Sequence, residues 1–228
     1  MPAGRPAGAR AGGRSQEILA TFTRHVAERG YDGTNFGDIA SELGMSKGTI
    51  VHHYGTKDRL LAALHEGYMT RRLAEARLLI ERTSSPGEQL AGLLYAFMLY
   101  QVEDREATVA FQREVVRIAR HEAGRQLRDE YLDLVRGVAG AGVAQGVFRS
   151  CDVELQTLLL MGAAQWAWTW FDPGGAKTVE EAGAALVDLV LGGMLARRTR
   201  LRDLADPNGR VAALVRECIA DVASTETR

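Results

Sequence analysis

Two adjacent histidines, His52 and His53, stand in the segment GMSKGTIVHHYGTK at residues 44–57, and imidazole side chains can bind a metal ion or carry a proton. On a helix, however, neighbouring side chains point about 100° apart, so this pair cannot hold one metal ion together. Neither histidine has a Glu or His partner three or four residues further on, the spacing that helical zinc sites use. The segment therefore predicts neither a metal site nor a catalytic site.

Other patterns that carry catalytic or cofactor chemistry are weak. The run GAGVAQG at residues 140–146 misses the GxGxxG spacing by one residue, and it ends a predicted helix instead of following a strand. Cys151 and Cys218 are too few for a disulfide scaffold and lack CxxC spacing. The sequence shows no nucleophile elbow, Walker loop or paired carboxylates. We expect no catalytic residue, no metal and no cofactor, and hence no enzyme.

Hydrophobic residues recur at helical spacing along most of the chain, and no segment alternates as a strand would. Charged residues at 25% and hydrophobic residues at 46% are ordinary for a globular protein. The fold class that we predict is all-α. The expected helices cover residues 15–29, 35–43, 46–53, 56–82, 87–102, 105–120, 122–145, 152–171 and 178–198, and a last helix follows residue 209.

Capping residues define the first helices most sharply. Asn35, Ser46 and Thr56 are placed to cap the second, third and fourth helices, and Gly30 and Gly44 to end the first and second. Two short helices joined by a glycine turn form a helix-turn-helix unit, with the first helix packed across them. We therefore expect a three-helix head, joined by a long helix to a helical body.

Two parts of the chain bear on localisation. Residues 1–14 lack the apolar core of a signal peptide and read as a flexible basic arm. The uncharged run from Leu155 to Phe171 is shorter than the roughly 20 apolar residues that span a bilayer, so we interpret it as a buried helix. We expect a cytoplasmic protein without membrane contact.

The region from Gly30 to Leu61 resembles the DNA-binding domain of TetR-type transcriptional repressors. The resemblance is carried by TNFGDIA (34–40), LGMSKGT (43–49) and HYGTK (53–57), in that order and spacing. It implies that the third helix enters the major groove of a palindromic operator. Val51 stands where members commonly have Tyr, and Tyr54 where they have Phe, so we expect this chain to read a DNA site of its own.

On that resemblance, Lys47 is expected to contact guanine or a phosphate, Gly48 to let the helix approach DNA closely, and Thr49 and Val51 to touch bases. The other expected contacts are to phosphate and sugar or lie at helix starts. The complete expected set is Thr34, Ser46, Lys47, Gly48, Thr49, Val51, His52, Tyr54 and Lys57.

In the body, WFDPGG (170–175), followed by a helix ending in LGGM (191–194), resembles the ligand domain of TetR-type regulators of steroid-ring, fatty-acid and related acyl-CoA catabolism. The resemblance implies a hydrophobic effector, for which we expect an acyl-CoA thioester. Arginines at 113, 117 or 120 are candidates for its phosphates, or form a solvated face. The aromatic pocket that we expect consists of Phe97, Tyr100, Phe111, Tyr131, Trp166 and Trp170, with Trp168 directed elsewhere.

The predicted helix at 178–198 is apolar nearly all round, and a partner subunit is the simplest cover for it. We therefore expect a homodimer through helices near 152–171 and 178–198. The predicted organisation is an arm (1–14), a helix-turn-helix domain (15–57) and a ligand-binding and dimerisation domain (58–228). Two alternatives to an acyl-CoA-responsive repressor stay open: a constitutive DNA-binding protein, and a drug-efflux regulator that responds to lipophilic compounds.

Overall fold

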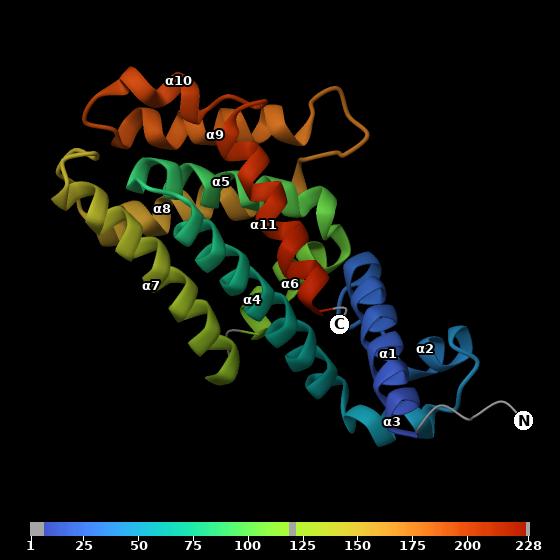
Figure 1. Cartoon of the computed structure of the whole chain (residues 1–228). Helices are drawn as coiled ribbons and strands as arrows, with labels where there is room; N and C mark the ends of the chain where they lie inside the picture. Colours follow the sequence, from blue (N-terminus) through green and yellow to red (C-terminus); the bar gives the residue numbers. More distant parts are fainter. Residues whose placement is uncertain (1–6, 119–121, 227–228) are drawn as a thin grey trace, which may run out of the picture. The chain divides into compact units, whose positions relative to one another are not determined.

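The computed structural model of the protein describes residues 7–118 and 122–226, and within these residues it consists of helices and turns (Figure 1). An isolated antiparallel bridge pairs Phe148 with Leu195. The all-α prediction is therefore confirmed. In chain order the helices are α1 (Ala7–Arg29), α2 (Phe36–Glu42), α3 (Lys47–Tyr54), α4 (Lys57–Arg82), α5 (Pro86–Glu103), α6 (Arg105–Ile118), α7 (Glu122–Ala144), α8 (Val153–Gln165), α9 (Val179–Met194), α10 (Leu201–Leu204) and α11 (Arg210–Glu226), with the 3₁₀ helices η1 (Trp166–Thr169) and η2 (Arg198–Arg200).

The first predicted helix boundary is wrong. We expected a flexible arm through residue 14, whereas α1 already begins at Ala7. The segment at 7–14 contains alanines and arginines, which favour helix, and these outweigh its glycines once the chain continues into a stable helix. The remainder of the predicted arm, residues 1–6, lies outside the described residues.

The structure divides into two compact units. The head unit comprises Met1–Tyr68 and Glu106–Arg125, and the body unit comprises Met69–Arg105 and Gln126–Arg228. Helix α6 thus belongs with the head, although the chain enters it directly from α5 of the body. The single boundary expected after residue 57 does not match this division, because α4 runs without a break from Lys57 to Arg82 and α6 packs on head residues.

The head unit is built around a small apolar core. Phe22 of α1, Ile39 of α2, Ile50 of α3 and Leu60 of α4 are each fully buried. Because each helix contributes only one apolar side to this core, the other sides of α2 and α3 face solvent. The core thereby holds α3 in place while leaving most of its outer residues exposed.

The body unit is organised around α5, which packs against α8, α9 and α11. Close approach of α9 to α5 depends on Gly183, because a Cβ at this position would lie 2.5 Å from the ring of Tyr95. Helix α11 is fastened by ion pairs as well as by packing: Arg216 lies 2.7 Å from Glu103 of α5, and Asp221 lies 2.7 Å from Arg82 of α4. Among the described residues, no helix is long and apolar enough to cross a bilayer.

Candidate nucleic-acid interface and effector site

The two short helices of the head begin at the capping residues that the sequence predicts. Asn35 Oδ1 accepts hydrogen bonds from the backbone N–H groups of Gly37 (2.8 Å) and Asp38 (3.1 Å). Ser46 Oγ accepts one from the N–H of Thr49 at 3.1 Å. Gly44 between the helices has a φ of 60°, which glycine adopts without strain. These contacts fix the helix-turn-helix geometry locally and confirm the predicted caps.

One side of α3 is exposed and carries several of the predicted DNA-contact residues. Lys47 and Val51, and likewise Gly48 and His52, are spaced by four residues; the two pairs lie on adjoining parts of one broad side of the helix, and all four residues are exposed. We call these residues the α3 face. Val51 is 48% exposed although it follows the fully buried Ile50, because neighbouring helix residues point about 100° apart. The head therefore presents a mixed basic and apolar surface on its third helix.

Details of the α3 face suit close approach by another molecule. A Cβ placed at Gly48 would meet no atom closer than 3.5 Å, so packing within the head does not require glycine there. The end of the Lys47 side chain lies against Gly37 of α2, where an added Cβ would be 2.9 Å from Lys47 Cε.

The rings of His52 and His53 are 5.7 Å apart and inclined by 73°. Among the described residues, no group of three His, Cys, Asp or Glu side chains is placed to hold a metal ion.

Three other predicted DNA-contact residues are engaged inside the head. Thr34 is 1% exposed and its hydroxyl donates to the carbonyl of Gly30 at 2.9 Å, so a DNA contact by this side chain is not supported. The hydroxyl of half-buried Tyr54 donates to the carbonyl of Ser15 at 2.9 Å. Lys57 Nζ donates to the carbonyl of Thr34 at 2.7 Å. These groups stabilise the head, because buried polar atoms need hydrogen-bond partners.

Arg113 and Arg117 of α6 are also committed to the head. Arg113 Nη1 donates to the carbonyls of Ala27 (2.6 Å) and Glu28 (3.1 Å) at the end of α1, and Arg117 Nη2 forms two hydrogen bonds with the carboxylate of Asp32. The expectation that they bind the phosphates of an effector is therefore not supported. Arg120, the third candidate, lies outside the described residues.

The predicted aromatic pocket does not form a single cluster. Phe97, Tyr100 and Tyr131 come together in the body, with ring centroids of Phe97 6.4 Å from Tyr100 and 6.0 Å from Tyr131. Phe111 instead lies in the head unit, where its ring stacks on the rings of His65 and Tyr68 of α4. Trp166 and Trp170 are 63% and 58% exposed. Because both side chains are exposed, they do not line an interior pocket. The helix expected over 152–171 ends at Gln165 and continues as η1.

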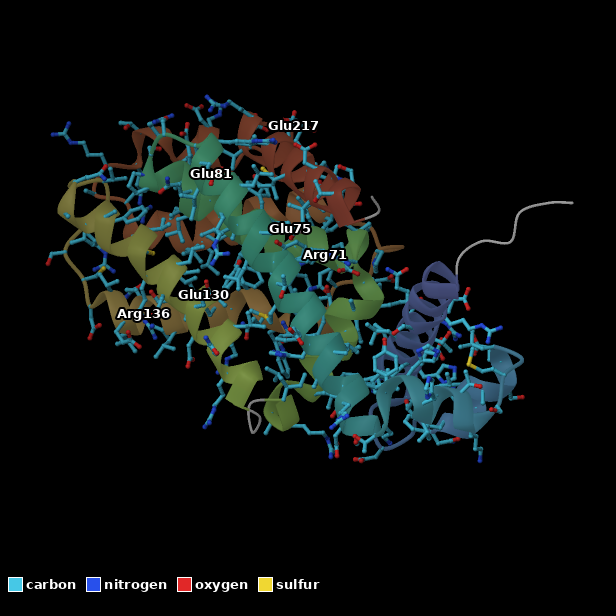
Figure 2. All side chains as sticks on the ribbon, turned by 60° about the horizontal axis from the view of Figure 1, so that its bottom comes forward. Arg71, Glu75, Glu81, Glu130, Arg136 and Glu217 are labelled. Carbon is cyan, nitrogen blue, oxygen red and sulfur yellow. The ribbon has the colours of Figure 1, made fainter. Side chains whose placement is uncertain are left out.

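A buried charged cluster between α4 and α5 was not predicted. Arg72 and Glu75 are each 3% exposed, and Arg72 Nε lies 3.2 Å from Glu75 Oε2. The guanidinium of Arg72 covers the ring of Tyr100 at 3.8 Å and reaches Asp104 Oδ2 at 3.0 Å. Arg71 pairs with the same carboxylate at 3.0 Å. Figure 2 labels Arg71 and Glu75 on α4.

The sequence did contain a signal for this cluster. Leu61, Leu64, Tyr68 and Leu79 form the buried side of α4, and positions 72 and 75 continue the same spacing. Charged residues at apolar positions of a helix are expensive to bury unless they are paired. Such positions are candidates for function, because burying an ionisable group lowers the stability of the protein, whereas an apolar side chain would fill the same position without this cost.

Two family models together match most of the chain, one in its N-terminal part and one in its C-terminal part. Residues 18–64 match the bacterial regulatory proteins of the tetR family, and residues 83–194 match the tetracyclin repressor-like C-terminal domain. The chain belongs to the TetR family. Members of this family are transcription regulators, so the predictions of family, fold and regulatory function are confirmed.

Similar proteins support the same conclusion along nearly their whole length. The HTH-type transcriptional repressor KstR2 of Mycobacterium tuberculosis is 28% identical over 189 residues, which cover 79% of this chain and 92% of KstR2. The solved structure of ketosteroid transcriptional regulator KstR2 from that organism superimposes with a TM-score of 0.72 at 27% identity, covering 80% of this chain and 95% of the other. AibR, solved in complex with isovaleryl coenzyme A and operator DNA, gives a TM-score of 0.69 at 25% identity, covering 77% and 97%.

The body of this TetR-family protein exposes a concentrated apolar surface on α8, η1 and α9. The side chains concerned are between 49% and 70% exposed in the single chain. The interpretation of residues 155–171 as a buried helix therefore holds for one side only, where Leu160, Met161 and Ala164 are buried. Several large apolar side chains exposed on neighbouring elements of one unit favour an interaction site. We call it the α8–α9 surface; it consists of Leu155, Leu158, Leu159, Trp166, Trp170 and Leu189.

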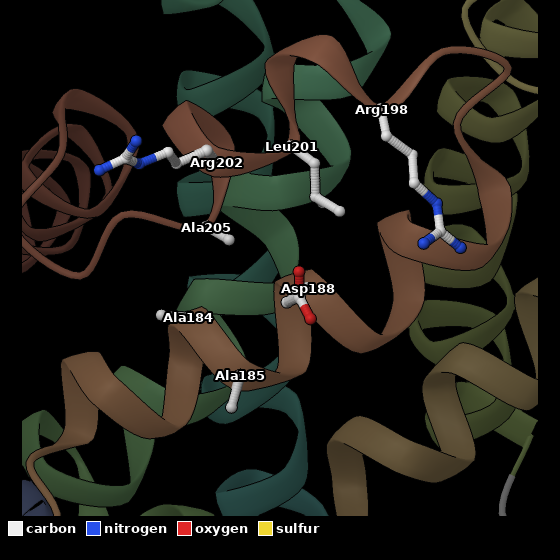
Figure 3. Close-up of a pocket in the computed structure, with 7 residues that line it drawn as sticks. All are labelled: Ala184, Ala185, Asp188, Arg198, Leu201, Arg202 and Ala205. Atoms are coloured by element: carbon white, nitrogen blue, oxygen red, sulfur yellow. The ribbon is translucent and has the colours of Figure 1, made fainter.

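A shallow groove of about 530 Å³ lies beside α9 in the same unit. Ala184, Ala185 and Asp188 of α9 form one wall, and Arg198 and Leu201 belong to the opposite wall (Figure 3). The groove includes none of the aromatic residues that the sequence predicts for an effector pocket. Its small side chains and mixed charges give an apolar effector little to bind.

Glu75 makes the stability of this regulator depend on pH. Burial raises the pKa of its carboxyl group from 4.5 to about 7, opposed by the charge of Arg72. Between these two values the folded protein keeps a proton that the unfolded chain releases, so the free energy of unfolding falls as pH rises through this range. A pKa change of this size corresponds to about 3 kcal/mol. Glu75→Gln, which is neutral at every pH, should therefore be more stable than the wild type by roughly that amount at pH 8.

Chemical denaturation of wild type and Glu75→Gln at pH 5 and pH 8 measures this difference. The matched control is Glu130→Gln, which removes an exposed carboxylate paired with Arg77 in the same unit (Figure 2). An exposed pair contributes about 0–1 kcal/mol, so this control should follow the wild type at both pH values. An equal pH dependence of wild type and Glu75→Gln would contradict the assignment to Glu75.

Proposed function

We propose that this TetR-family regulator represses transcription as a homodimer on a palindromic operator, and that an acyl-CoA thioester of a hydrophobic acid releases it. The observation that carries the effector is the AibR structure, in which a relative of the same fold holds isovaleryl coenzyme A and operator DNA. The name of KstR2, a ketosteroid transcriptional regulator, links a second relative to an apolar, ring-bearing class of molecule. Such a regulator acts in the cytoplasm, where its DNA is.

The DNA-binding part of the proposal rests on the α3 face. A helix of this width fits the major groove, and its first turns lie nearest to the base edges. Lys47 supplies a positive charge for guanine or phosphate, Val51 an apolar contact for a thymine methyl group, and His52 a polar contact for the backbone. Thr49 and Ser46 are half-exposed or exposed at the start of the helix, within reach of the same groove.

The dimer rests on the α8–α9 surface. Exposed leucines at 155, 158 and 159 follow helical spacing on α8, and Leu189 of α9 is 70% exposed. A symmetric interface brings the same patch from both chains together, so one apolar surface can bury itself against its copy. Leucine and tryptophan side chains also supply the large apolar contacts that permanent interfaces use.

The effector part of the proposal is supported in this chain by the aromatic residues of the body. Phe97, Tyr100 and Tyr131 offer apolar ring surface, and buried Arg72 beside Tyr100 offers a charged group. Apolar walls with a few placed polar groups are typical of ligand sites. An effector that binds the DNA-free arrangement of the dimer more tightly shifts the population away from DNA, and about 1.4 kcal/mol of difference suffices for a tenfold effect.

Selection of genomic fragments by the purified protein, followed by release assays, tests both parts. The release panel contains isovaleryl-CoA, longer and ring-bearing acyl-CoA thioesters, the corresponding free acids, and free coenzyme A. We expect at least one thioester to weaken operator binding about tenfold or more, while the free acid and free coenzyme A leave it unchanged. Phe97→Ala should bind the same fragment but respond less to that thioester.

Other outcomes identify the competing functions. Release by lipophilic drug-like compounds and by no thioester would indicate a regulator of drug efflux. Binding that no compound in the panel changes would indicate a constitutive DNA-binding protein. Either result would overturn the acyl-CoA proposal while leaving the DNA-binding function in place.

A further inference from the structure

Tyr31 occupies the turn after α1 and contacts three elements of the head unit. The residue is 8% exposed. Two cations contact its ring, with Lys57 Nζ 4.0 Å from the ring centroid and the guanidinium of Arg117 4.4 Å from it. Its hydroxyl donates to Asp58 Oδ1 at 2.5 Å. Lys57 and Asp58 begin α4, whereas Arg117 belongs to α6, so this one side chain joins both helices.

Helix α6 holds the turn that contains Tyr31 through charged groups and backbone atoms. Glu114 Oε1 accepts the backbone N–H of Tyr31 at 2.9 Å, and Glu114 Oε2 accepts from Arg117 Nε at 3.2 Å. Arg113 meets carbonyls at the end of α1, which lack partners within the helix and favour a positive charge. Gly30, with a φ of 74°, turns the chain directly after this end. The register of α6 on α1 is thereby fixed at several points.

The first turn of α4 lies immediately beyond the recognition helix. Only Gly55 and Thr56 separate Tyr54, the last residue of α3, from Lys57. Lys57 Nζ also donates to the carbonyl of Thr34 at 2.7 Å, in the turn that leads into α2. The position of this first turn therefore sets where α3 ends and how the α3 face is presented.

Packing alone does not account for these contacts. A leucine or phenylalanine would fill the same space, yet the ring here is contacted by two cations from different helices and its hydroxyl is bonded to a carboxylate. Cation–π contacts are directional, so they constrain both cations relative to the ring. A displacement of α6 against this turn must move the ring, and with it the first turn of α4.

We propose that Tyr31 is a positioning residue for DNA binding, which transmits the placement of α6 to the first turn of α4 and so to the recognition helix. This inference rests on the proposed DNA-binding function of the α3 face. Tyr31 acts through Lys57 and Asp58 and does not itself contact DNA. Coupling of this kind is demonstrated by non-additive substitutions and not by proximity alone.

A double-mutant cycle between Arg117→Gln and Tyr31→Leu tests the proposal, using the genomic fragment recovered by the wild-type protein. We expect each single substitution to weaken binding about tenfold, and the double variant to be weakened by about the same factor instead of about 100-fold. Tyr31→Phe keeps the ring that the two cations contact, so it should bind within about threefold of wild type and retain the effect of Arg117→Gln.

Matched controls separate this role from a general loss of structure. Arg136→Gln removes a body-unit arginine that pairs with Asp133 and Glu154, and it should change neither operator affinity nor the effect of Tyr31→Leu. Thermal unfolding followed by circular dichroism shows that each variant is folded. If Tyr31→Leu does not fold, Tyr31→Met takes its place in the cycle, because it also removes the ring that contacts Lys57 and Arg117, and the same non-additivity with Arg117→Gln is expected.

The outcomes distinguish the two proposals. Wild-type protein that recovers no DNA would refute the DNA-binding function and this inference with it. Wild-type binding with effects of Arg117→Gln and Tyr31→Leu that multiply would overturn the role of Tyr31 alone. Single substitutions that leave operator affinity unchanged in folded protein would overturn it as well.

Discussion

Replacing Lys47 by alanine and Val51 by aspartate together is expected to lower operator affinity about 1,000-fold without unfolding the protein. Both residues are exposed on the α3 face, so neither change removes core packing. Loss of the lysine removes one base or phosphate contact, and the new carboxylate is repelled by phosphates. At about 1–3 kcal/mol for each contact, the two changes add to roughly 4 kcal/mol. Equilibrium binding to the selected fragment, with thermal unfolding alongside, measures the effect.

Val102→Asp is the matched control for the new charge. Val102 is 45% exposed, close to the 48% of Val51, but it lies on α5 of the body unit. This variant changes the net charge by the same amount and should bind the operator as the wild type does. Lys47→Ala alone should also reduce the salt slope of binding by about 1 if the lysine meets a phosphate. Equal weakening by Val51→Asp and Val102→Asp would contradict the assignment of the α3 face.

Leu159→Arg is expected to convert the dimer to monomers at micromolar concentration and thereby to abolish operator binding. Leu159 is 59% exposed on α8 and belongs to the α8–α9 surface. A symmetric interface contains each residue twice, so one substitution buries two like charges. An uncompensated buried charge costs about 3–5 kcal/mol. Two heads that are no longer linked lose the gain in affinity that simultaneous binding of two half-sites provides.

Sedimentation velocity and operator binding of the same preparation measure the two consequences. Val102→Arg introduces the same charge at an exposed apolar position outside the α8–α9 surface, and it should remain dimeric. A Leu159→Arg protein that sediments as a dimer and binds the operator normally would show that the subunits meet elsewhere. Wild-type protein that sediments as a monomer would contradict the dimer itself.

Local sequence signals were sufficient for the two short helices of the helix-turn-helix and for the residues that cap them. Asn35 and Ser46 cap their helices as predicted, because a cap is formed by a side chain and backbone groups only two or three residues away. The α3 face could be predicted in the same way, since Ile50 is the apolar residue of a short helix and its neighbours must point outward. The start of α1 was missed, because residues 7–14 contain three glycines and are helical only as a continuation of the helix that follows.

Contacts between distant residues could not be predicted in this way. The sequence shows Tyr31, Arg117 and Lys57 as separate polar and aromatic residues, and only the packing of α6 on the head brings them together. The same holds for Trp166 and Trp170, whose helical spacing indicated a shared face but not that the face is exposed. Exposure depends on which neighbouring helix covers a residue.

By itself the sequence determined that this protein is an all-α TetR-family regulator with a helix-turn-helix head, because periodicity, caps and motif spacing are encoded within a few residues of one another. Only the tertiary structure decided that α6 belongs to the head, that Thr34 and Lys57 are bonded inside it, and that Arg72 and Glu75 are buried as a pair. Each of these depends on the burial and charge that a side chain meets when segments far apart in the chain pack together, which no local pattern records.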